Sequence, residues 1–266
     1  MLEHTDPHEC TEHDTHVLWA CDARLPVLLV CDHASCAIPP DLDDLGLPPE
    51  LIATHIGWDI GAARVSKLLG ERLQVPIVQA ATSRLVVDCN RRLDDPSAFP
   101  QVSGGIVVPG NAQLDDAARS DRAERFYWPY HHAVRDQIRE LESLAAAPAV
   151  IAIHSFTPAL DEEQRPWHIG ALWDKDSRIA RPFMKVLSNQ ADISVGDNEP
   201  YSGRHPADFT LDHHAEAEGL PHLGIEVRQD LIADEQGARK WAAILADALS
   251  PVLNDSALYT HRTGVV

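Results

Sequence analysis

Two histidines stand at the ends of apolar segments that are typical of buried strands. His33 comes directly after Asp32 and the run PVLLVC (26–31), and His154 comes directly after VIAI (150–153). In an open α/β sheet, ligands bind beyond the carboxyl ends of the strands, so polar side chains there are the first candidates for chemistry. Two imidazoles and one carboxylate suit a catalytic zinc site, because three protein ligands leave one position open for water.

A carboxylate outside the metal ligands is the next requirement of such a site. Water that attacks an amide must lose a proton, and the departing amine must gain one. Glu226 lies within the apolar segment HLGIEVR (222–228), where a carboxylate is costly unless something specific uses it. We expect Glu226 to carry this proton. The alternative is a buried ion pair with Arg84 or Arg228.

The carboxylate that completes the metal site stays open on these grounds alone. Asp32 directly follows the first strand, and Asp59 lies where a second helical segment begins. Asp59 has a plain alternative role as an acidic residue at a helix N-terminus. His33 and His154 have one as hydrogen-bonded core histidines.

The elements that must position these residues alternate between strand and helix. Strands are predicted at 26–31, 76–81, 84–89, 149–156, 168–174, 193–197 and 222–228. Helices are predicted at 50–73, 115–146 with an interruption near Pro129, 177–190, 208–218 and 234–249. This order predicts an α/β fold, a single domain with a mixed, mostly parallel sheet and helices on both faces.

Two segments lie outside this alternation of strands and helices, a tail and a long loop. Residues 1–17 are polar and rich in His, without apolar periodicity, and we expect a mobile tail; the catalytic domain then spans 18–266. A Gly- and Pro-rich loop at about 90–113 is long enough to be functional, and we expect it to close over a substrate.

Composition excludes several classes of partner. The chain has 266 residues, with 22 Lys and Arg against 41 Asp and Glu, so its formal net charge is −19. This argues against binding to nucleic acid or to anionic membranes, but leaves room for a small anionic substrate in a locally basic pocket. The sequence has no apolar run long enough to cross a membrane, no visible secretory signal and an odd number of cysteines, all in its first third, so we expect a cytoplasmic protein.

Six segments together resemble the N-formylglutamate amidohydrolases. They occur in the family's order over residues 26–250 and are CDHASCAIP (31–39), GWDIGA (57–62), SRLVVDCNR (83–91), AIHSFTP (152–158), DNEPYSG (197–203) and GIEVRQD (224–230). The resemblance implies a phosphorylase/hydrolase-like fold, as in zinc-dependent exopeptidases. It also implies hydrolysis of N-formyl-L-glutamate to formate and glutamate, a late step of histidine degradation in some bacteria.

The resemblance also implies a ligand set for one zinc ion. His33 and His154 match the motif histidines, and Asp59 matches the acid of the W-D pair. Asp59 could instead orient a ligand histidine, and Asp32 is the rival for the third place. Cys36 stands where family members often carry Asn or another polar residue, and a thiolate there could also bind metal.

The resemblance also implies which residues transfer the proton and bind the substrate. Glu226 matches the position where related zinc exopeptidases keep their general base. Asn90 and Arg91 are similar to the Asn-Arg pair that holds a substrate carboxylate in those enzymes, and Arg84 and Arg228 would add positive charge. The planar guanidinium suits the two carboxylates of N-formylglutamate.

Two other functions remain open at this point. The first is a thiol-dependent amidase that uses Cys36 with His33 or His154, without a metal. The second is a metal- or ligand-binding relative that keeps the fold without the activity; the His-rich N-terminus motivates it. The oligomeric state, the acyl group and the physiological metal are left open.

Overall fold

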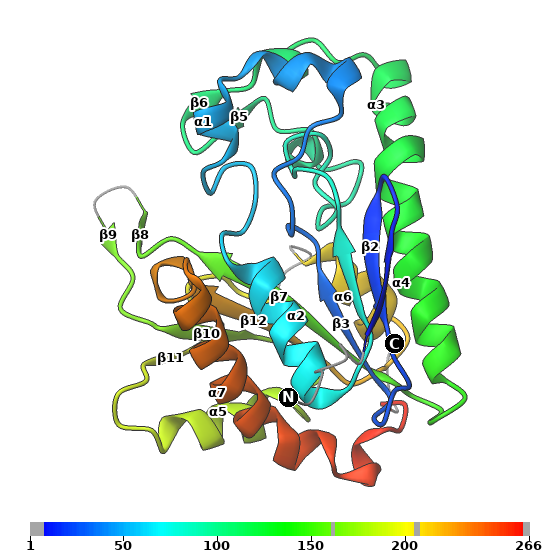
Figure 1. The fold of residues 1–266 in the computed structure, drawn as a ribbon, viewed down its shortest axis with the longest axis vertical. Coiled ribbons are helices and arrows are strands. Elements are labelled where there is room, and N and C mark those ends of the chain that lie inside the picture. Colours follow the sequence, from blue (N-terminus) through cyan, green and yellow to red (C-terminus); the bar gives the residue numbers. More distant parts are fainter. Residues whose placement is uncertain (1–7, 161–162, 205–207, 263–266) are drawn as a thin grey trace, which may run out of the picture.

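A twisted eight-stranded sheet forms the centre of the computed structural model, which describes residues 8–160, 163–204 and 208–262 (Figure 1). The strands follow the order β1-β2-β4-β3-β7-β12-β10-β11. They are β1 (Glu9–Glu12), β2 (His16–Ala20), β3 (Val27–Cys31), β4 (Ile77–Ala80), β7 (Ala149–Phe156), β10 (Ile169–Leu172), β11 (Val195–Asp197) and β12 (His222–Arg228).

The middle of this sheet is parallel. The neighbours β4, β3, β7 and β12 run in one direction, β2 and β10 lie antiparallel beside them, and β11 runs parallel to β10. The expected mixed, mostly parallel sheet is therefore confirmed. Because β3, β7 and β12 are adjacent and parallel, the residues at their carboxyl ends meet at one edge of the sheet.

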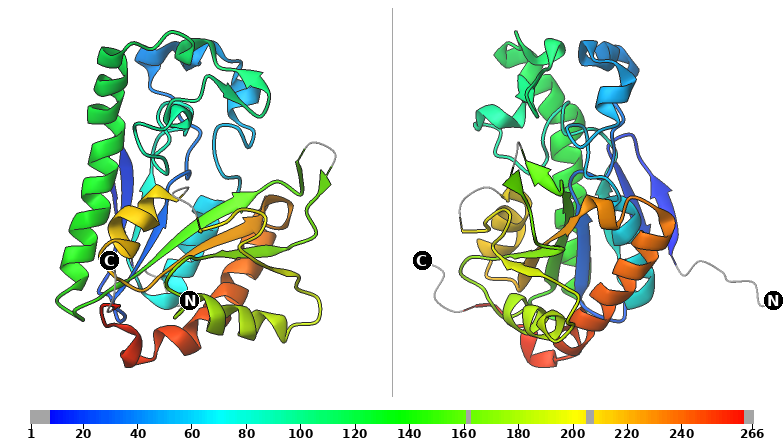
Figure 2. Two further views of the ribbon diagram at one scale, coloured as in Figure 1. Left: turned by 180° about the vertical axis from the view of Figure 1, so that it is seen from behind. Right: turned by 90° about the vertical axis from the view of Figure 1, so that its left-hand side faces the viewer.

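Helices cover both faces (Figure 2). On one face α2 (Ala62–Leu73), α5 (Ala180–Ser188) and α7 (Glu235–Leu253) share a buried core with the sheet. On the other face lie α4 (Trp128–Leu141) and the short α6 (Phe209–Leu211). Successive residues of β3 alternate between the two cores, as a strand buried on both sides requires.

The predicted strand at 84–89 is wrong. These residues form turns, with the Val86 N–H donating to the Ser83 carbonyl at 2.9 Å. Leu85, Val86 and Val87 are buried all the same, in the core on the α4 side. The apolar pattern therefore predicts burial correctly but not the strand. Because β4 already pairs with β2 on one side and β3 on the other, it has no free edge for another strand.

The expected mobile tail is also wrong for the part of it that the structure describes. Residues 9–12 form β1, which pairs with β2 from Glu9–Ala20 to Glu12–Val17. His8 is buried, and its Nε2 donates to the Val75 carbonyl at 2.9 Å. Backbone pairing depends little on side-chain periodicity, which explains why a polar segment could extend the sheet. Residues 1–7 lie outside the described residues.

Three of the predicted helices are interrupted, and at 208–218 the short α6 is followed by a π-helical segment (Asp212–Glu216). The segment 50–73 is divided into α1 (Pro49–Ile52) and α2 by a turn that carries Asp59. The segment 115–146 becomes α3 (Asp116–Arg122), a π-helical segment (Ala123–Tyr127) and α4. Its interruption lies just before Pro129, which has no N–H to continue the helical hydrogen bonds.

Two small hairpins complete the fold, and both lie at the same side of the molecule (Figure 1). The strands β5 (Val102–Ser103) and β6 (Ile106–Val107) pair within the predicted loop at 90–113. The strands β8 (Ala159–Leu160) and β9 (Glu163–Gln164) follow β7. Among the described residues, no helix combines the length and the apolar character that a membrane crossing needs.

Candidate active site

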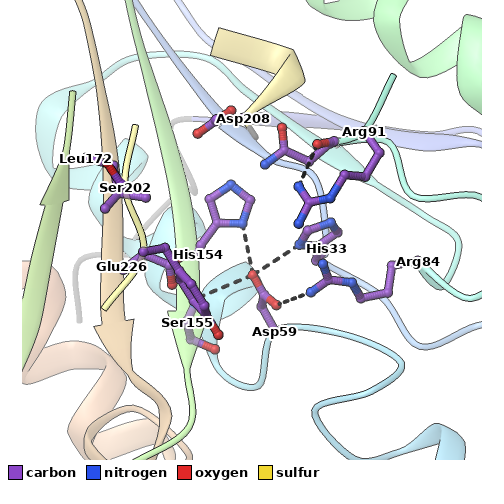
Figure 3. Close-up of a pocket in the computed structure, with 12 residues that line it drawn as sticks. His33, Asp59, Arg84, Arg91, His154, Ser155, Leu172, Ser202, Asp208 and Glu226 are labelled. Atoms are coloured by element: carbon purple, nitrogen blue, oxygen red, sulfur yellow. Dashed lines mark hydrogen bonds and ion pairs between the residues drawn. The ribbon is translucent and has the colours of Figure 1, made fainter. Parts of the chain in front are cut away.

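The adjacent strands β3, β7 and β12 bring the two histidines and Glu226 together. His33 lies two residues beyond β3, and His154 lies in β7, in register with Glu226 of β12. All three side chains are buried and line one cavity of about 330 Å³. Figure 3 shows His33, His154 and Glu226 around this cavity.

The turn between α1 and α2 supplies Asp59. Its backbone N–H donates to the His33 carbonyl at 2.9 Å, which fixes the turn against the end of β3. Gly57 is needed for the tight turn, because a Cβ there would lie 2.1 Å from the Ile52 carbonyl oxygen. Asp59 is thereby buried at the centre of the cluster.

Three potential ligand atoms converge in this cluster. Asp59 Oδ2 lies 2.9 Å from His154 Nδ1 and 3.3 Å from His33 Nδ1. Each of the three residues offers one ligand atom within 4.8 Å of the other two, and no other group of His, Cys, Asp and Glu does so among the described residues. The buried group His33, Asp59 and His154 could therefore hold a metal ion.

Two further carboxylates lie behind the imidazoles. His33 Nε2 lies 2.7 Å from Asp88 Oδ1, and His154 Nε2 lies 3.2 Å from Asp32 Oδ2. When Nε2 carries the proton, Nδ1 keeps a lone pair for a metal, and such outer carboxylates usually fix the tautomer and the ring of a ligand histidine. This geometry places Asp32, the rival for third ligand, on the far side of His154.

Asp32 is held in that position by two hydroxyl groups. Tyr130 of α4 donates to Asp32 Oδ1 at 2.8 Å, and Thr210 of α6 donates to the same atom at 2.5 Å. The Thr210 N–H also donates to Asn90 Oδ1 at 3.1 Å. Thr210 thus connects the residue behind His154 with a candidate residue for substrate binding.

The cluster is a region of negative potential. Burial on its own raises the pKa of Asp59, but the contacting imidazoles outweigh it and lower that pKa well below its usual range. Burial lowers the pKa of His154, but its contacts with Asp32 and Asp59 outweigh this and raise it well above its usual value. The field that favours a protonated imidazole also favours a divalent cation between these groups.

Glu226, like Asp32, has a buried carboxylate oxygen that makes no hydrogen bond to the described residues. Its Oε2 is buried without a hydrogen-bond partner, although buried polar atoms are almost always paired. Burial raises the pKa of Glu226 to about 7, an effect that the nearby His154 opposes and Asp59 reinforces. The alternative, an ion pair with Arg84 or Arg228, is not what the structure shows, because both arginines bind other carboxylates.

The candidate substrate-binding residues fall into two groups. Arg84, Asn90 and Arg91 line the cavity, and the Arg91 guanidinium donates to the Asn90 carbonyl at 2.9 Å. Arg84 contacts Asp59 Oδ1 at 3.3 Å and Asp88 Oδ2 at 2.9 Å, so it holds these two carboxylates on either side of His33. Arg228 is not among the lining residues, because its guanidinium pairs with Asp230 at 2.7 Å.

Five further residues line the cavity that were not among the site residues predicted from the sequence. They are Ser155, Leu172, Tyr201, Ser202 and Asp208. Tyr201 and Ser202 belong to the segment DNEPYSG (197–203), whose resemblance to the family was the available signal. No feature of the sequence pointed to Asp208. Cys36 does not line this cavity and packs against the core on the α4 side, which leaves the thiol-dependent amidase without structural support.

Comparison with known proteins finds a matching family model and similar solved structures. The family model for N-formylglutamate amidohydrolase matches residues 25–233. A gene product from Agrobacterium tumefaciens of known crystal structure is 37% identical and superposes with a TM-score of 0.86, covering 91% of this chain and 95% of its own.

A second solved structure shows the same fold at lower identity. N-formylglutamate amidohydrolase from Ralstonia eutropha JMP134 is 19% identical, with a TM-score of 0.64 over 90% of this chain and 97% of its own. No curated protein matches the sequence.

Proposed function

The chain belongs to the N-formylglutamate amidohydrolase family, and from this premise we propose that it is a metal-dependent amidohydrolase of linear amides. The proposed substrate is a small N-acylated acidic amino acid, with N-formyl-L-glutamate, cleaved to formate and glutamate, as the foremost candidate. The observation that carries the proposal is the convergence of His33 Nδ1, His154 Nδ1 and Asp59 Oδ2 in the cavity that Glu226 lines.

The proposed metal is one zinc ion held by His33, Asp59 and His154. Two neutral imidazoles and one carboxylate are ligands that zinc prefers, and three of them leave a position for water or substrate. The ion would supply Lewis-acid chemistry, polarising the amide carbonyl and making water a stronger acid. The residues present fit a zinc ion, since Asp88 lies beside Nε2 of His33 and Asp32 lies beside Nε2 of His154, which leaves both Nδ1 atoms for the metal.

Glu226 moves the proton in the proposed reaction. Its carboxylate accepts a proton from the attacking water as the new C–O bond forms. It then gives this proton to the amide nitrogen while the C–N bond breaks, which releases the acid and the free amine. A carboxyl group whose pKa is raised to about 7 by burial is suited to both steps at neutral pH.

Asn90 and Arg91 are proposed to bind the substrate carboxylate. Both line the cavity, and an arginine fork can accept a carboxylate with two parallel hydrogen bonds. We propose that Arg84 positions Asp59 and Asp88, which its guanidinium contacts, in addition to any contact that it makes with the substrate. Arg228 is not part of this proposal.

The reaction would take place in the cytoplasm, as a late step of histidine degradation. Cys21, Cys31, Cys36 and Cys89 form no disulfide within the described part of the chain, which is consistent with a reducing compartment. The experiment that tests the proposed function combines elemental analysis of the purified protein with formate release from N-formyl-L-glutamate. A protein that binds about one zinc ion and hydrolyses no N-formyl, N-acetyl or N-carbamoyl amino acid would be a non-catalytic relative instead.

A further inference from the structure

The cleft continues beyond the active-site cavity into a second cavity of about 310 Å³, here called the outer chamber. The two cavities share Asp59, Arg84, Arg91, Ser155 and Tyr201, so a ligand at the metal cluster has direct access to the outer chamber. A substrate that reaches both cavities is therefore larger than one that fills the first alone.

The outer chamber has an apolar rim. Five large apolar side chains are exposed among the described residues, and three of them, Val102, Leu160 and Tyr201, line this chamber. They are 57%, 50% and 45% exposed. Exposed apolar side chains that gather at one place are typical of ligand-binding grooves, whereas single ones need no explanation.

These side chains come from separate parts of the chain. Val102 lies in the hairpin of β5 and β6, Leu160 in the hairpin of β8 and β9, and Tyr201 follows β11. Ile56 and Phe156 add buried apolar surface to the lining. Three independent loops thus turn apolar groups toward one space, which local folding of any single loop does not require.

Tyr201 stands between the two cavities in a fixed position. The guanidinium of the buried Arg165 donates to the Tyr201 hydroxyl at 3.1 Å and lies 4.9 Å from the centre of its ring. The same guanidinium donates to the Thr157 hydroxyl at 3.1 Å. The shared wall is therefore preorganised for contact with a ligand.

N-formylglutamate has no apolar group to place against the rim of this chamber. Its formyl group is a single carbon, and its side chain ends in a carboxylate. Arg84 and Arg91 both belong to the wall that the two cavities share, so a substrate carboxylate is expected at that wall and not at the apolar rim beyond it. Pockets that enclose drug-sized ligands begin at about 300 Å³, so each cavity alone is large for such a small substrate.

We propose that the outer chamber is a substrate subsite for an apolar alkyl or aryl group, so that the enzyme accepts N-acyl amino acids that carry such a group. The inference rests on the proposed amide hydrolysis at the metal cluster. The apolar group can belong to the amino acid or to the acyl part, and the experiment below separates these two sources.

The test compares pairs of substrates with the zinc-loaded protein. N-formyl-L-phenylalanine against N-formyl-L-alanine probes the side chain, and N-phenylacetyl-L-alanine against N-formyl-L-alanine probes the acyl part. We expect kcat/KM to be at least about tenfold higher for the aromatic member of one pair, the usual scale for filling an apolar subsite. The pair that shows the preference identifies the source.

Two exposed positions provide a matched pair of variants. Leu160→Ser, alone or with Val102→Ser, is expected to lower kcat/KM for the preferred aromatic substrate about tenfold and to leave N-formyl-L-alanine unchanged. Leu144→Ser is the control, since Leu144 is 52% exposed and does not line the cleft. Substitutions at such exposed positions rarely unfold a protein.

Calorimetric binding to Glu226→Gln separates this inference from the proposed function. Selective binding of the aromatic ligand that depends on Leu160, without any turnover by the unmodified protein, supports the subsite and contradicts the hydrolase. Turnover of N-formyl-L-glutamate or N-formyl-L-alanine, without aromatic preference in either pair, overturns the subsite and leaves the hydrolase standing. Equal losses in Leu160→Ser and Leu144→Ser also overturn the subsite.

Discussion

Asp88 Oδ1 lies 2.7 Å from Nε2 of His33, on the side of the imidazole that faces away from Asp59. Asp88 is buried, and its second oxygen accepts a hydrogen bond from Arg84 at 2.9 Å. Burial opposes ionisation, but His33 and Arg84 outweigh it and lower the pKa of Asp88 well below its usual range. An ionised carboxylate therefore fixes the ring of a candidate metal ligand from behind.

Replacing Asp88 by Asn should weaken metal binding. The amide keeps the size of the side chain but removes the charge that holds a proton on His33 Nε2, so Nδ1 becomes a poorer ligand. We expect the zinc dissociation constant to rise about 10- to 100-fold, as for other second-layer partners of metal ligands. Competition with a chromogenic chelator measures it.

Asp94→Asn is the control for Asp88→Asn. Asp94 pairs with Arg92 on the surface, where both side chains are largely exposed, so its loss should leave zinc affinity unchanged. Equal zinc affinity in Asp88→Asn and the unmodified protein would contradict the role of Asp88.

Replacing Glu226 by Gln should remove turnover and spare the metal. Gln cannot accept the proton of the attacking water, and loss of a general base typically costs at least about two orders of magnitude. We expect kcat for the best N-formyl substrate to fall at least about 100-fold, while elemental analysis finds the zinc content of the unmodified protein.

The matched control is Glu216→Gln, because Glu216 is also buried but binds His222 at 3.1 Å, outside the active-site cavity. Its activity should stay within a few-fold of the unmodified enzyme. Full activity in Glu226→Gln would show that another group moves the proton.

The sequence could predict the parallel strands and the side chains that follow them. Long apolar runs identify β3, β7 and β12, and residues at the carboxyl ends of adjacent parallel strands must lie close together. This reasoning brought His33, His154 and Glu226 to one site. It could not identify which strands would be neighbours, and for that reason the buried segment 84–89 was expected to join a sheet that has no free edge beside β4.

Residues positioned by turns and by distant contacts were harder to predict. Asp59 lies in a turn between α1 and α2 that helical periodicity extends across, and the resemblance to the family was needed to favour it. The position of Arg228 in the late strand favours a role in substrate binding, but in the structure its guanidinium binds Asp230, two residues further on. No sequence motif identifies Thr210, because its role depends on hydrogen bonds to Asp32 and Asn90, which lie far away in the sequence.

Replacing Thr210 by Val should loosen Asp32 behind His154. The variant keeps the shape of the side chain but removes the hydroxyl that donates to Asp32 Oδ1 at 2.5 Å. Hydrogen bonds to charged groups contribute about 1.5–3 kcal/mol, so we expect a loss of unfolding free energy of this order. Denaturant unfolding and zinc competition measure the two effects.

Thr210→Ser separates the hydroxyl from the packing. Ser restores the donor but lacks the methyl group, so it should recover most of the zinc affinity that Thr210→Val loses. If Val and Ser behave alike, the methyl group and not the hydrogen bond to Asp32 explains the effect.

The buried pair His131 and His214 should make the fold sensitive to acid. His131 Nδ1 lies 3.0 Å from His214 Nε2, and His131 Nε2 lies 3.0 Å from the Cys89 carbonyl, so one proton in each contact satisfies both rings in the neutral form. Burial lowers the pKa of His131 to about 4 and that of His214 to about 3, with mutual repulsion adding to the effect on His214.

The direction of the pH effect follows from these depressed values. Below the ordinary histidine pKa of about 6.5 the unfolded chain binds protons that the folded protein does not, so stability is complete above that pH and falls as the pH decreases toward about 4. One pKa unit corresponds to about 1.4 kcal/mol, so the pair should account for a few kcal/mol over this window.

Denaturant unfolding of the chelator-treated protein at about pH 7.5, 6.5, 5.5 and 4.5 measures this loss of stability. His214→Gln keeps an N–H donor toward His131 without a titrating group and should lose less stability across the series than the unmodified protein. His132→Gln changes an exposed neighbour on the same helix and should follow the unmodified protein. Parallel curves for His214→Gln and the unmodified protein would show that acid destabilises the fold through other groups.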